Sequence, residues 1–401
     1  MSKIQYLLSV VVPTHNRSQY AVACVQSLLD IPSEKLQVVV HDTSTDSGGL
    51  SDWAAGVSDS RLCYVHWRER LSMTENHERA LALAEGEYVC LIGDDDSVSS
   101  KIIQVAEFAS RNAIGCLTPQ VKAMYSWPDF RTRLLGAAHA GRLYLDDFNG
   151  ALQRLETAPG LAWTLGAACQ GTDALPKLYH GLVRRDLLDQ LRIKQGRVFF
   201  GTSPDMSAAI GLALSCREHH VIDLPFTLPG ASSGSNTGRS AVNKHKGDLD
   251  KDTHMQPFKD LHWPDVLPRF FSVETVWAHA AWETLRVAAT DKQRHVFSLR
   301  RLYALCLLNH WDYRRETLSA LSVAREQGVS GLSRVHLVFE YINCVVHLFI
   351  AKAKRVMRPS ASNGKEVLAV VSNVYLARKA LDARLSQSEV FSRVLGRGYN
   401  D

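Results

Sequence analysis

Three consecutive aspartates, Asp94, Asp95 and Asp96, are the side chains in this sequence best suited to chemistry. They follow a short apolar run at residues 88–92 that is typical of a buried strand. Adjacent carboxylates repel one another, and a divalent cation removes that repulsion. Hard cations such as Mg²⁺ and Mn²⁺ prefer oxygen ligands, often one or two carboxylates together with substrate phosphates. A solvated acidic turn that begins the next helix is the alternative interpretation, because aspartate is also favoured at helix N-termini.

Short apolar runs alternate with helical patterns over about the first 120 residues. We expect strands at residues 7–12, 36–41, 61–66 and 88–92, and helices at residues 18–30, 47–57 and 73–85. This alternation predicts an α/β fold, with a mostly parallel, Rossmann-like sheet covered by helices on both faces. Such sheets bind ligands beyond the carboxyl ends of their strands. Polar residues follow three of the predicted strands: Thr14, Asn16 and Arg17, then Asp42, then the triple aspartate.

The chain of 401 residues is longer than most single hydrophobic cores allow, which predicts more than one domain. Further strands are expected at residues 142–145 and 221–224, an extended segment at 178–184, and helices at 146–155 and 203–216. Residues 229–268 lose periodicity, which predicts a flexible loop or lid. Helical patterns then follow one another to the end. We therefore expect an α/β domain at 1–228, the loop at 229–268 and an all-α C-terminal domain at 269–401.

Bulk composition excludes several classes of protein. The net charge of +5 is too small to indicate a nucleic-acid-binding protein. The eight cysteines include no Cys-x-x-Cys pair, which argues against a zinc cluster or a disulfide scaffold. The sequence has no run of about 18 apolar residues and no N-terminal signal pattern. We expect a cytoplasmic protein.

Four segments resemble, in order and spacing, family 2 glycosyltransferases of the GT-A fold. They are residues 9–17 (SVVVPTHNR), 39–46 (VVHDTSTD), 75–80 (ENHERA) and 86–96 (GEYVCLIGDDD). The Gly-Asp-Asp-Asp form is similar to bacterial enzymes that build surface polysaccharides, including abequosyltransferase-like enzymes. The resemblance implies a nucleotide-sugar donor, a Mn²⁺ or Mg²⁺ ion, and a GT-A catalytic domain at residues 1–228.

The resemblance also implies roles for individual residues. Metal coordination falls on Asp95, supported by Asp96. Donor binding falls on Thr14 (base and ribose), Asn16, Arg17 (near the diphosphate), Asp42 (a pyrimidine N–H), Asn76 and Arg79 (one helix face), and Asp94 (ribose or sugar). For three of the residues assigned to donor binding, a structural interpretation is the alternative: Asp42 would be a turn or cap aspartate, and Asn76 and Arg79 would lie on a solvated helix face.

Two positions depart from the family pattern. Residues 41–44 read His-Asp-Thr-Ser where the family usually has Asn-Asp-Gly-Ser. Gly93 stands where the family often has the first aspartate of Asp-x-Asp-Asp. These departures leave the base preference and the set of metal ligands open.

Inverting sugar transfer to a hydroxyl needs a general base. The resemblance implies that role for Asp205, which begins a predicted helix after Pro204. A helix-initiating aspartate is the alternative interpretation. The Gln-x-x-Arg-Trp motif of processive polysaccharide synthases is absent from the sequence, so we expect one sugar to be added per event.

The sequence thus predicts an inverting, metal-dependent glycosyltransferase of bacterial surface polysaccharide or lipopolysaccharide biosynthesis. It would transfer a hexosyl or deoxyhexosyl group from a nucleotide sugar, with a pyrimidine nucleotide favoured, to a glycan or lipid-linked acceptor. A sugar nucleotidyltransferase is one alternative, although the Gly-rich loop that such enzymes carry after the first strand is missing. The other alternative is a non-catalytic nucleotide-sugar-binding or scaffold protein.

One segment near the C-terminus bears on where in the cell the protein is found. Between residues 334 and 359, polar residues recur with near-helical spacing among apolar ones, and Lys352, Lys354, Arg355 and Arg358 lie at the end. A basic amphipathic helix suits the inner face of the cytoplasmic membrane. Its apolar arc is wider than a surface helix usually buries, so we expect it to pack mainly inside a helical bundle, with only its basic end making peripheral membrane contact.

Overall fold

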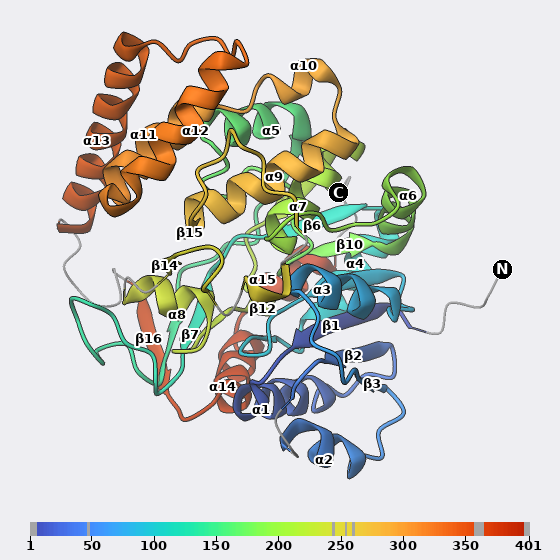
Figure 1. Ribbon diagram of the computed structural model, residues 1–401. Coiled ribbons are helices and arrows are strands. Elements are labelled where there is room, and N and C mark those ends of the chain that lie inside the picture. The colour runs from blue at the N-terminus through green and yellow to red at the C-terminus, as the bar shows by residue number, and fades with distance from the viewer. Residues whose placement is uncertain are drawn as a thin grey trace.

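The computed structural model describes residues 6–45, 49–242, 245–252, 255–258, 261–356 and 365–396, with side chains of the helix that ends at 356 described up to 350. A main sheet of eight strands runs from the middle of Figure 1 down to its lower right. Across the sheet the strands are β3 (Leu62–His66), β2 (Leu36–Asp42), β1 (Leu8–Thr14), β4 (Tyr88–Leu91), β10 (Leu182–Arg184), β6 (Cys116–Pro119), β11 (Glu218–Ile222) and β9 (Leu152–Glu156).

Most neighbours in this sheet are parallel. β1 pairs in parallel with β2 and β4, β2 with β3, and β6 with β11. Only β10 and β9 run antiparallel to their neighbours. The carboxyl ends of β1, β2 and β4 therefore meet at one edge, as the sequence predicts.

Alternate residues of β1 pack on opposite faces of the sheet, as strand geometry requires. Leu8, Val10 and Val12 belong to one core, and Val11 belongs to another. The first core is built with α1 (Ser18–Leu29), α2 (Gly49–Ala55) and α4 (Ile102–Arg111). The second is built with α3 (Met73–Ala82), α6 (Arg185–Gln195) and α7 (Pro204–Ser215). The predicted fold class, a mostly parallel α/β sheet with helices on both faces, is confirmed.

A helical region with its own core lies beyond α7, at the top of Figure 1. One side of α7 contributes to this core and the other side to the sheet core, so α7 joins the two. The predicted helical C-terminal region is confirmed. The C-terminal helices are α9 (Val273–Ala288), α10 (Asp291–Arg294), α11 (Leu299–Asn309), α12 (Arg314–Glu326) and α13 (Arg334–Val356), with a 3₁₀ turn at Trp311–Tyr313. They are joined in this core by α5 (Thr157–Gly166) and by a 3₁₀ turn at Gln256–Phe258 from earlier in the chain.

The end of the described chain returns to the sheet half. There β16 (Glu366–Val370) extends a second sheet with the order β13 (Gly230–Ala231), β7 (Ala123–Ser126), β8 (Arg142–Leu145) and β16. α14 (Val374–Ser386) and α15 (Val390–Leu395) bury apolar residues in the same core as α1. Residues 366–395 therefore pack with the α/β part, although the helical pattern of 269–401 suggested one all-α unit. In Figure 1 α14 lies beside α1.

Two further segments differ from their sequence-based expectations. The helix expected at 146–155 is wrong: Gly150 has a φ of +79°, and Leu152–Glu156 instead forms β9 against β11. The segment 229–268 contains local structure, beginning with β13. It continues with α8 (Asn236–Ala241) and β14 (Lys246–Gly247). β14 pairs with β15 (Phe271–Ser272), which follows the segment. Just before the segment, β12 (Thr227–Leu228) pairs with β5 (Ser97–Val98).

None of the helices in the described part of the chain is long and apolar enough to cross a membrane. The expectation that α13 is mainly buried inside a bundle is wrong. Its side chains from Val335 to Ile350 are mostly exposed, because α13 lies at the outer edge of the helical region and packs along one side only, against α11.

The return of α14 to the sheet core yields a stability prediction. Leu381 is fully buried in that core, whereas Leu376 on the same helix is 40% exposed. Leu381→Ala should lower the free energy of unfolding by about 2–5 kcal/mol, because it leaves a cavity. Leu376→Ala, the matched control, should cost less than about 1 kcal/mol. Urea unfolding of both variants checks this, and equal stability of the two would contradict the packing of α14.

Candidate functional site

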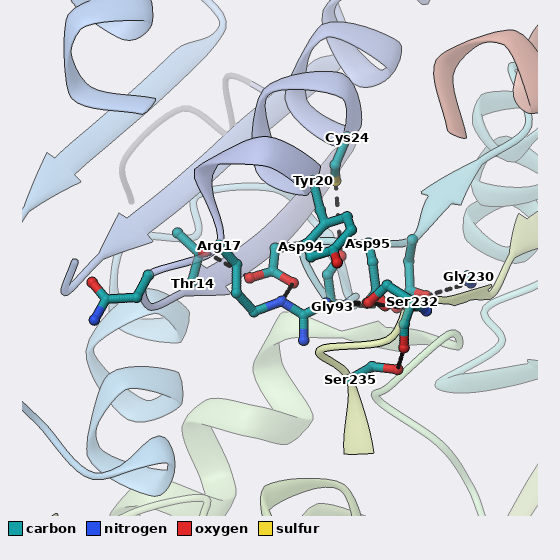
Figure 2. A network of polar contacts seen from close by, with 12 residues as sticks. Thr14, Arg17, Tyr20, Cys24, Gly93, Asp94, Asp95, Gly230, Ser232 and Ser235 are labelled. Carbon is teal, nitrogen blue, oxygen red and sulfur yellow. Dashed lines mark hydrogen bonds and ion pairs between the residues drawn. The ribbon is translucent and has the colours of Figure 1, made fainter. Parts of the chain in front are cut away.

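The triple aspartate lies in a turn that leaves β4 at the carboxyl edge of the main sheet. Asp94, Asp95 and Asp96 are all buried, although carboxylates are almost never buried unless they are paired. Figure 2 shows the groups that converge on this turn, from the loop after β1 and from the segment around β13. Partners from distant parts of the chain therefore hold the carboxylates in place.

The loop after β1 supplies the first partners. Thr14 Oγ1 donates a hydrogen bond of 2.6 Å to Asp94 Oδ2. Arg17 bridges two carboxylates, with Nε 2.9 Å from Asp94 Oδ1 and Nη2 3.0 Å from Asp95 Oδ2. The guanidinium also lies over the ring of Tyr20, at 4.9 Å from its centroid. Thr14 and Arg17, which the sequence assigned to the donor pocket, thus lie directly beside the acidic turn.

Asp96 is bound from the opposite side. Its Oδ2 accepts hydrogen bonds from the Gly93 N–H (2.7 Å) and the Tyr179 hydroxyl (2.8 Å), and lies 3.0 Å from His180 Nε2. Its Oδ1 accepts a 2.6 Å bond from the Gly230 N–H. These contacts assign Asp96 chiefly to holding the turn.

Steric crowding explains why position 93 is a glycine. A Cβ there would lie 2.6 Å from the Tyr179 hydroxyl and 3.0 Å from Asp96 Oδ2. A real Cβ does not approach other atoms so closely. A side chain at position 93 would therefore require the Tyr179 hydroxyl to shift from its present place beside Asp96.

The segment around β13 closes the turn from a third direction. Ser232 Oγ donates to Asp95 Oδ2 at 2.6 Å and receives a hydrogen bond from Arg17 Nη2 at 2.8 Å. The Trp127 indole N–H donates to the Asp95 carbonyl at 2.9 Å. A Cβ on Gly230 would lie 1.9 Å from that carbonyl oxygen, so only glycine allows this close approach.

Burial and mutual repulsion alter the acidities of the aspartates. Burial raises the pKa of Asp95 to about 6; the Asp96 and Asp94 carboxylates add to this rise, while Arg17 and Ser232 oppose it. Burial also raises the pKa of Asp94, against the effects of Arg17 and Thr14. Although burial acts in the same direction on Asp96, the interaction with His180 and the hydrogen bonds it accepts lower its pKa. The turn therefore holds negative charge at a cost that a bound cation would offset.

Asn16, Asp42 and Asn76 brace the neighbouring loops. Asn76 Nδ2 donates to the Thr14 carbonyl at 3.0 Å, and Asn76 Oδ1 lies 2.6 Å from His41 Nδ1. Asp42 accepts hydrogen bonds from the Ser44 N–H and the Tyr64 hydroxyl, each at 2.8 Å. Asn16, with a φ of +52°, accepts a 2.7 Å hydrogen bond from the Thr45 N–H. These contacts favour positioning roles, and for Asp42 they match the turn-aspartate alternative.

Arg79 lies apart from the aspartates. Its guanidinium stacks over Trp67 at 4.2 Å from the ring centroid and pairs with Glu75 at 3.0 Å. A partly exposed side chain held in this way matches the alternative of a solvated helix face. Residue 46, the last of the second family-like segment, lies outside the described residues.

Asp205 lies in the first turn of α7 and is exposed. Ser203 Oγ donates a hydrogen bond to its carboxylate. After burial, the carboxylates of Asp96, Asp95 and Asp205 all raise the pKa of the Tyr179 hydroxyl. Asp205 thus influences the hydroxyl that binds Asp96, and its own side chain is exposed to solvent.

Sequence reasoning missed Tyr179, Gly230 and Ser232. These residues lie 83 or more positions from their aspartate partners in the chain. No periodicity reports contacts over such distances. The one usable signal was the Pro-Gly-Ala-Ser sequence at 229–232, because glycine often marks a close backbone approach. His180, with a φ of +60°, also contacts Asp96.

Within the described ranges, no three His, Cys, Asp or Glu side chains are arranged so that they alone could hold a metal ion. The donors at the turn are nevertheless carboxylate oxygens, which suit Mg²⁺ or Mn²⁺. Two of the three carboxylates, those of Asp94 and Asp95, share one guanidinium there. The residues therefore fit a cation that takes one or two protein oxygens and completes its shell with a ligand.

Comparison with known proteins gives a family for part of the chain. Residues 9–159 match the family model described as Glycosyl transferase family 2. The glycosyltransferase GlyG of Streptococcus pneumoniae is 30% identical over 99 residues, which are 24% of this chain and 33% of that protein. A protein of Escherichia coli described as a colanic acid biosynthesis glycosyl transferase, WcaA, is 33% identical over 92 residues, 22% of this chain and 33% of that protein. The chain thus spans about a third of the length of these curated relatives.

A solved structure of similar outline is that of S. aureus TarS, residues 1–349, in complex with UDP-GlcNAc. The TM-score is 0.47 at 15% identity, and the match covers 83% of this chain and 89% of that one. The same TarS segment with UDP matches with a TM-score of 0.41.

The raised pKa of Asp95 yields a pH-dependent stability prediction. Its folded-state pKa of about 6 lies above the ordinary value of 3.8, so the folded state binds a proton more readily than the unfolded state. Stability therefore falls as the pH rises from about 4 to about 6 and then levels off. Asp95→Asn removes the charge and should stabilise the fold above pH 6 by on the order of 1–3 kcal/mol.

Melting curves of Asp95→Asn and the natural protein between pH 4 and pH 8 check this prediction. Asp223→Asn is the control, because Asp223 is also buried but lies outside the turn, paired with Lys122. A stability gain for Asp95→Asn that does not change with pH would contradict the assigned acidity.

Proposed function

We propose that this chain is a nucleotide-sugar-dependent glycosyltransferase whose donor diphosphate binds at the triple-aspartate turn. One observation carries the proposal. Buried carboxylates of Asp94 and Asp95 meet the Arg17 guanidinium at the carboxyl edge of a mostly parallel sheet, inside the segment that matches Glycosyl transferase family 2. Sheets of this kind bind ligands at that edge.

The donor's charge determines which groups bind it. Arg17 is a fixed cation beside the turn: burial lowers its pKa, but Asp94 and Asp95 raise it by more, so it stays protonated. We propose that Asp95 holds a Mn²⁺ or Mg²⁺ ion, with Asp96 supporting the turn behind it. When bound, the ion would stabilise the charge on the leaving diphosphate. Thr14, Asn16, Asp42 and Asn76 would shape the pocket for the base and ribose, and Asp94 would bind the ribose or sugar.

Asp205 is the proposed general base that acts on the acceptor hydroxyl. An exposed carboxylate at the start of α7 can accept the proton of an acceptor hydroxyl as that oxygen attacks the sugar carbon. Attack opposite the leaving diphosphate inverts the configuration at that carbon. Since the motif of processive synthases is absent, one sugar is added per event.

The wider assignment rests on the relatives. A glycosyltransferase of Streptococcus pneumoniae and an Escherichia coli protein described as a colanic acid biosynthesis glycosyl transferase are 30% and 33% identical to this chain over 99 and 92 residues. The TarS structure holds UDP-GlcNAc. We propose a pyrimidine-nucleotide donor, a hexosyl or deoxyhexosyl group, and a glycan or lipid-linked acceptor of the bacterial surface on the cytoplasmic side.

A panel of nucleotide sugars, incubated with the full chain and Mn²⁺, tests the proposed class of activity. Slow hydrolysis of one nucleotide sugar, releasing a nucleoside diphosphate, is the expected result. Release of pyrophosphate from a nucleoside triphosphate and a sugar phosphate would instead identify a nucleotidyltransferase. Binding of nucleotide sugars without any turnover, with or without added glycan acceptors, would favour a non-catalytic binding protein.

Donor binding should depend on the metal. Isothermal titration of a nucleoside diphosphate should give an affinity about tenfold or more higher with Mn²⁺ than with EDTA, the scale of one charge-assisted contact. Asp95→Ala should abolish the difference. Asp223→Ala serves as the matched control, since it removes a buried carboxylate elsewhere and should leave the metal effect intact. Equal affinity with EDTA and Mn²⁺ in the natural protein would refute the metal site.

Turnover should depend on Asp205. Asp205→Asn should lower kcat by about two to four orders of magnitude, the usual scale for loss of a general base, while the affinity for the donor stays nearly unchanged. Asp186→Asn is the matched control because Asp186 occupies the same position in the first turn of α6. Near-normal turnover of Asp205→Asn would transfer the role to another group.

A further inference from the structure

Over residues 334–350, where its side chains are described, the helix α13 packs against the described part of the protein along one side. Leu337 joins the helical core and Cys344 is fully buried. Between them, Glu340 pairs with Arg301 Nη1 at 2.7 Å and with Arg300 Nε at 3.2 Å, both on α11. These three residues recur every third or fourth position, so they define the inner side of α13.

The opposite side of α13 is apolar and exposed. Phe339 and Phe349 are 69% and 73% exposed, although large aromatic side chains usually lie in cores or interfaces. At about 100° per residue, the residues of this outer face fall within an arc of about 140° and extend over about 22 Å of helix. The outer face consists of Val335, Val338, Phe339, Ile342, Val345, Val346, Phe349 and Ile350.

No charged side chain interrupts the outer face. Its polar border on one side consists of His336, Asn343 and His347, all exposed. A contiguous apolar surface of this kind is rare on a protein that stays alone in water, and it marks a contact with another molecule or a membrane. The charges in the sequence around the outer face indicate which kind of molecule covers it.

The charged residues that follow Glu340 along the chain, from residue 341 to residue 365, are all basic. Residues 341–365 contain five Lys or Arg and no Asp or Glu. Lys352, Lys354 and Arg355 lie near the carboxyl end of α13, while Arg358 lies outside the described residues. The single acidic residue of α13, Glu340, is engaged by Arg300 and Arg301.

This charge pattern disfavours a second copy of the chain as the occupant. In a parallel pair of α13 helices, the basic ends would lie side by side. In an antiparallel pair, each basic end would lie beside Arg334 and His336 at the start of the other helix. Neither pairing supplies an acidic partner, whereas an anionic lipid surface complements both the apolar face and the cations.

We propose that the outer face of α13 docks the protein on an anionic membrane surface, with the helix lying in the plane of the interface. The apolar side chains enter the boundary between headgroups and acyl chains, and the basic end contacts anionic headgroups. None of the residues that carry this proposal belongs to the triple-aspartate turn or to α7. The proposal therefore stands or falls separately from the proposed activity.

Cosedimentation of the full chain with vesicles tests the proposal. Binding is expected to vesicles that contain phosphatidylglycerol in phosphatidylcholine, to be weaker with phosphatidylcholine alone, and to decrease as salt rises. The double variant Phe339→Glu/Phe349→Glu should bind anionic vesicles about tenfold or more weakly, because it places two charges within the apolar face. Both substitutions lie on an exposed surface, so the variant should fold, which circular dichroism and thermal melting verify.

Ile193→Glu is the matched control. Ile193 is an 83% exposed residue on α6, on a different part of the surface, and its substitution should leave vesicle binding unchanged. Absence of binding to anionic vesicles at low salt would overturn the proposal, as would normal binding by the double variant. A dimer in sedimentation velocity that the double variant dissociates would also overturn it, since a second copy would then cover the face.

Discussion

The repulsion among three buried carboxylates is the constraint on which the rest of this structure depends. Asp94, Asp95 and Asp96 leave the end of a sheet strand together, and each unpaired charge in such a place is costly. The protein offsets the cost by bringing donors from separate segments. Arg17 and Thr14 come from the loop after β1, Tyr179 and His180 from the approach to β10, and Gly230 and Ser232 from β13 and the loop after it.

These contacts require close backbone approaches, which explains two glycines. Gly93 makes room for the Tyr179 hydroxyl, and Gly230 lets β13 approach the Asp95 carbonyl. Asp96 is contacted by four donors, whereas Asp94 and Asp95 share the single Arg17 guanidinium. Burial raises the pKa of Asp95, and the neighbouring carboxylates of Asp96 and Asp94 add to the rise, because the negative charges there are not fully balanced.

The local features of this site could be predicted from the sequence. The strands β1, β2 and β4 and the helices between them follow from apolar periodicity, and that placed Thr14, Arg17 and the aspartates at one sheet edge. The partners from residues 179–232 could not be predicted, because their contacts depend on how distant segments pack. Packing between distant segments also explains two wrong expectations. Residues 152–156 form a strand rather than a helix because they pair with β11. The outer face of α13 is exposed because no described segment packs over it.

The central claim is that the triple-aspartate turn is the site of a metal-bound donor diphosphate. A crystal structure of the protein with a nucleoside diphosphate and Mn²⁺ tests it most directly, since Mn²⁺ is located by its anomalous scattering. The account predicts an anomalous peak in direct contact with an Asp95 carboxylate oxygen and a diphosphate oxygen, with Arg17 turned toward the diphosphate. A nucleotide bound elsewhere, with Arg17 still joined to Asp94 and Asp95, would contradict it.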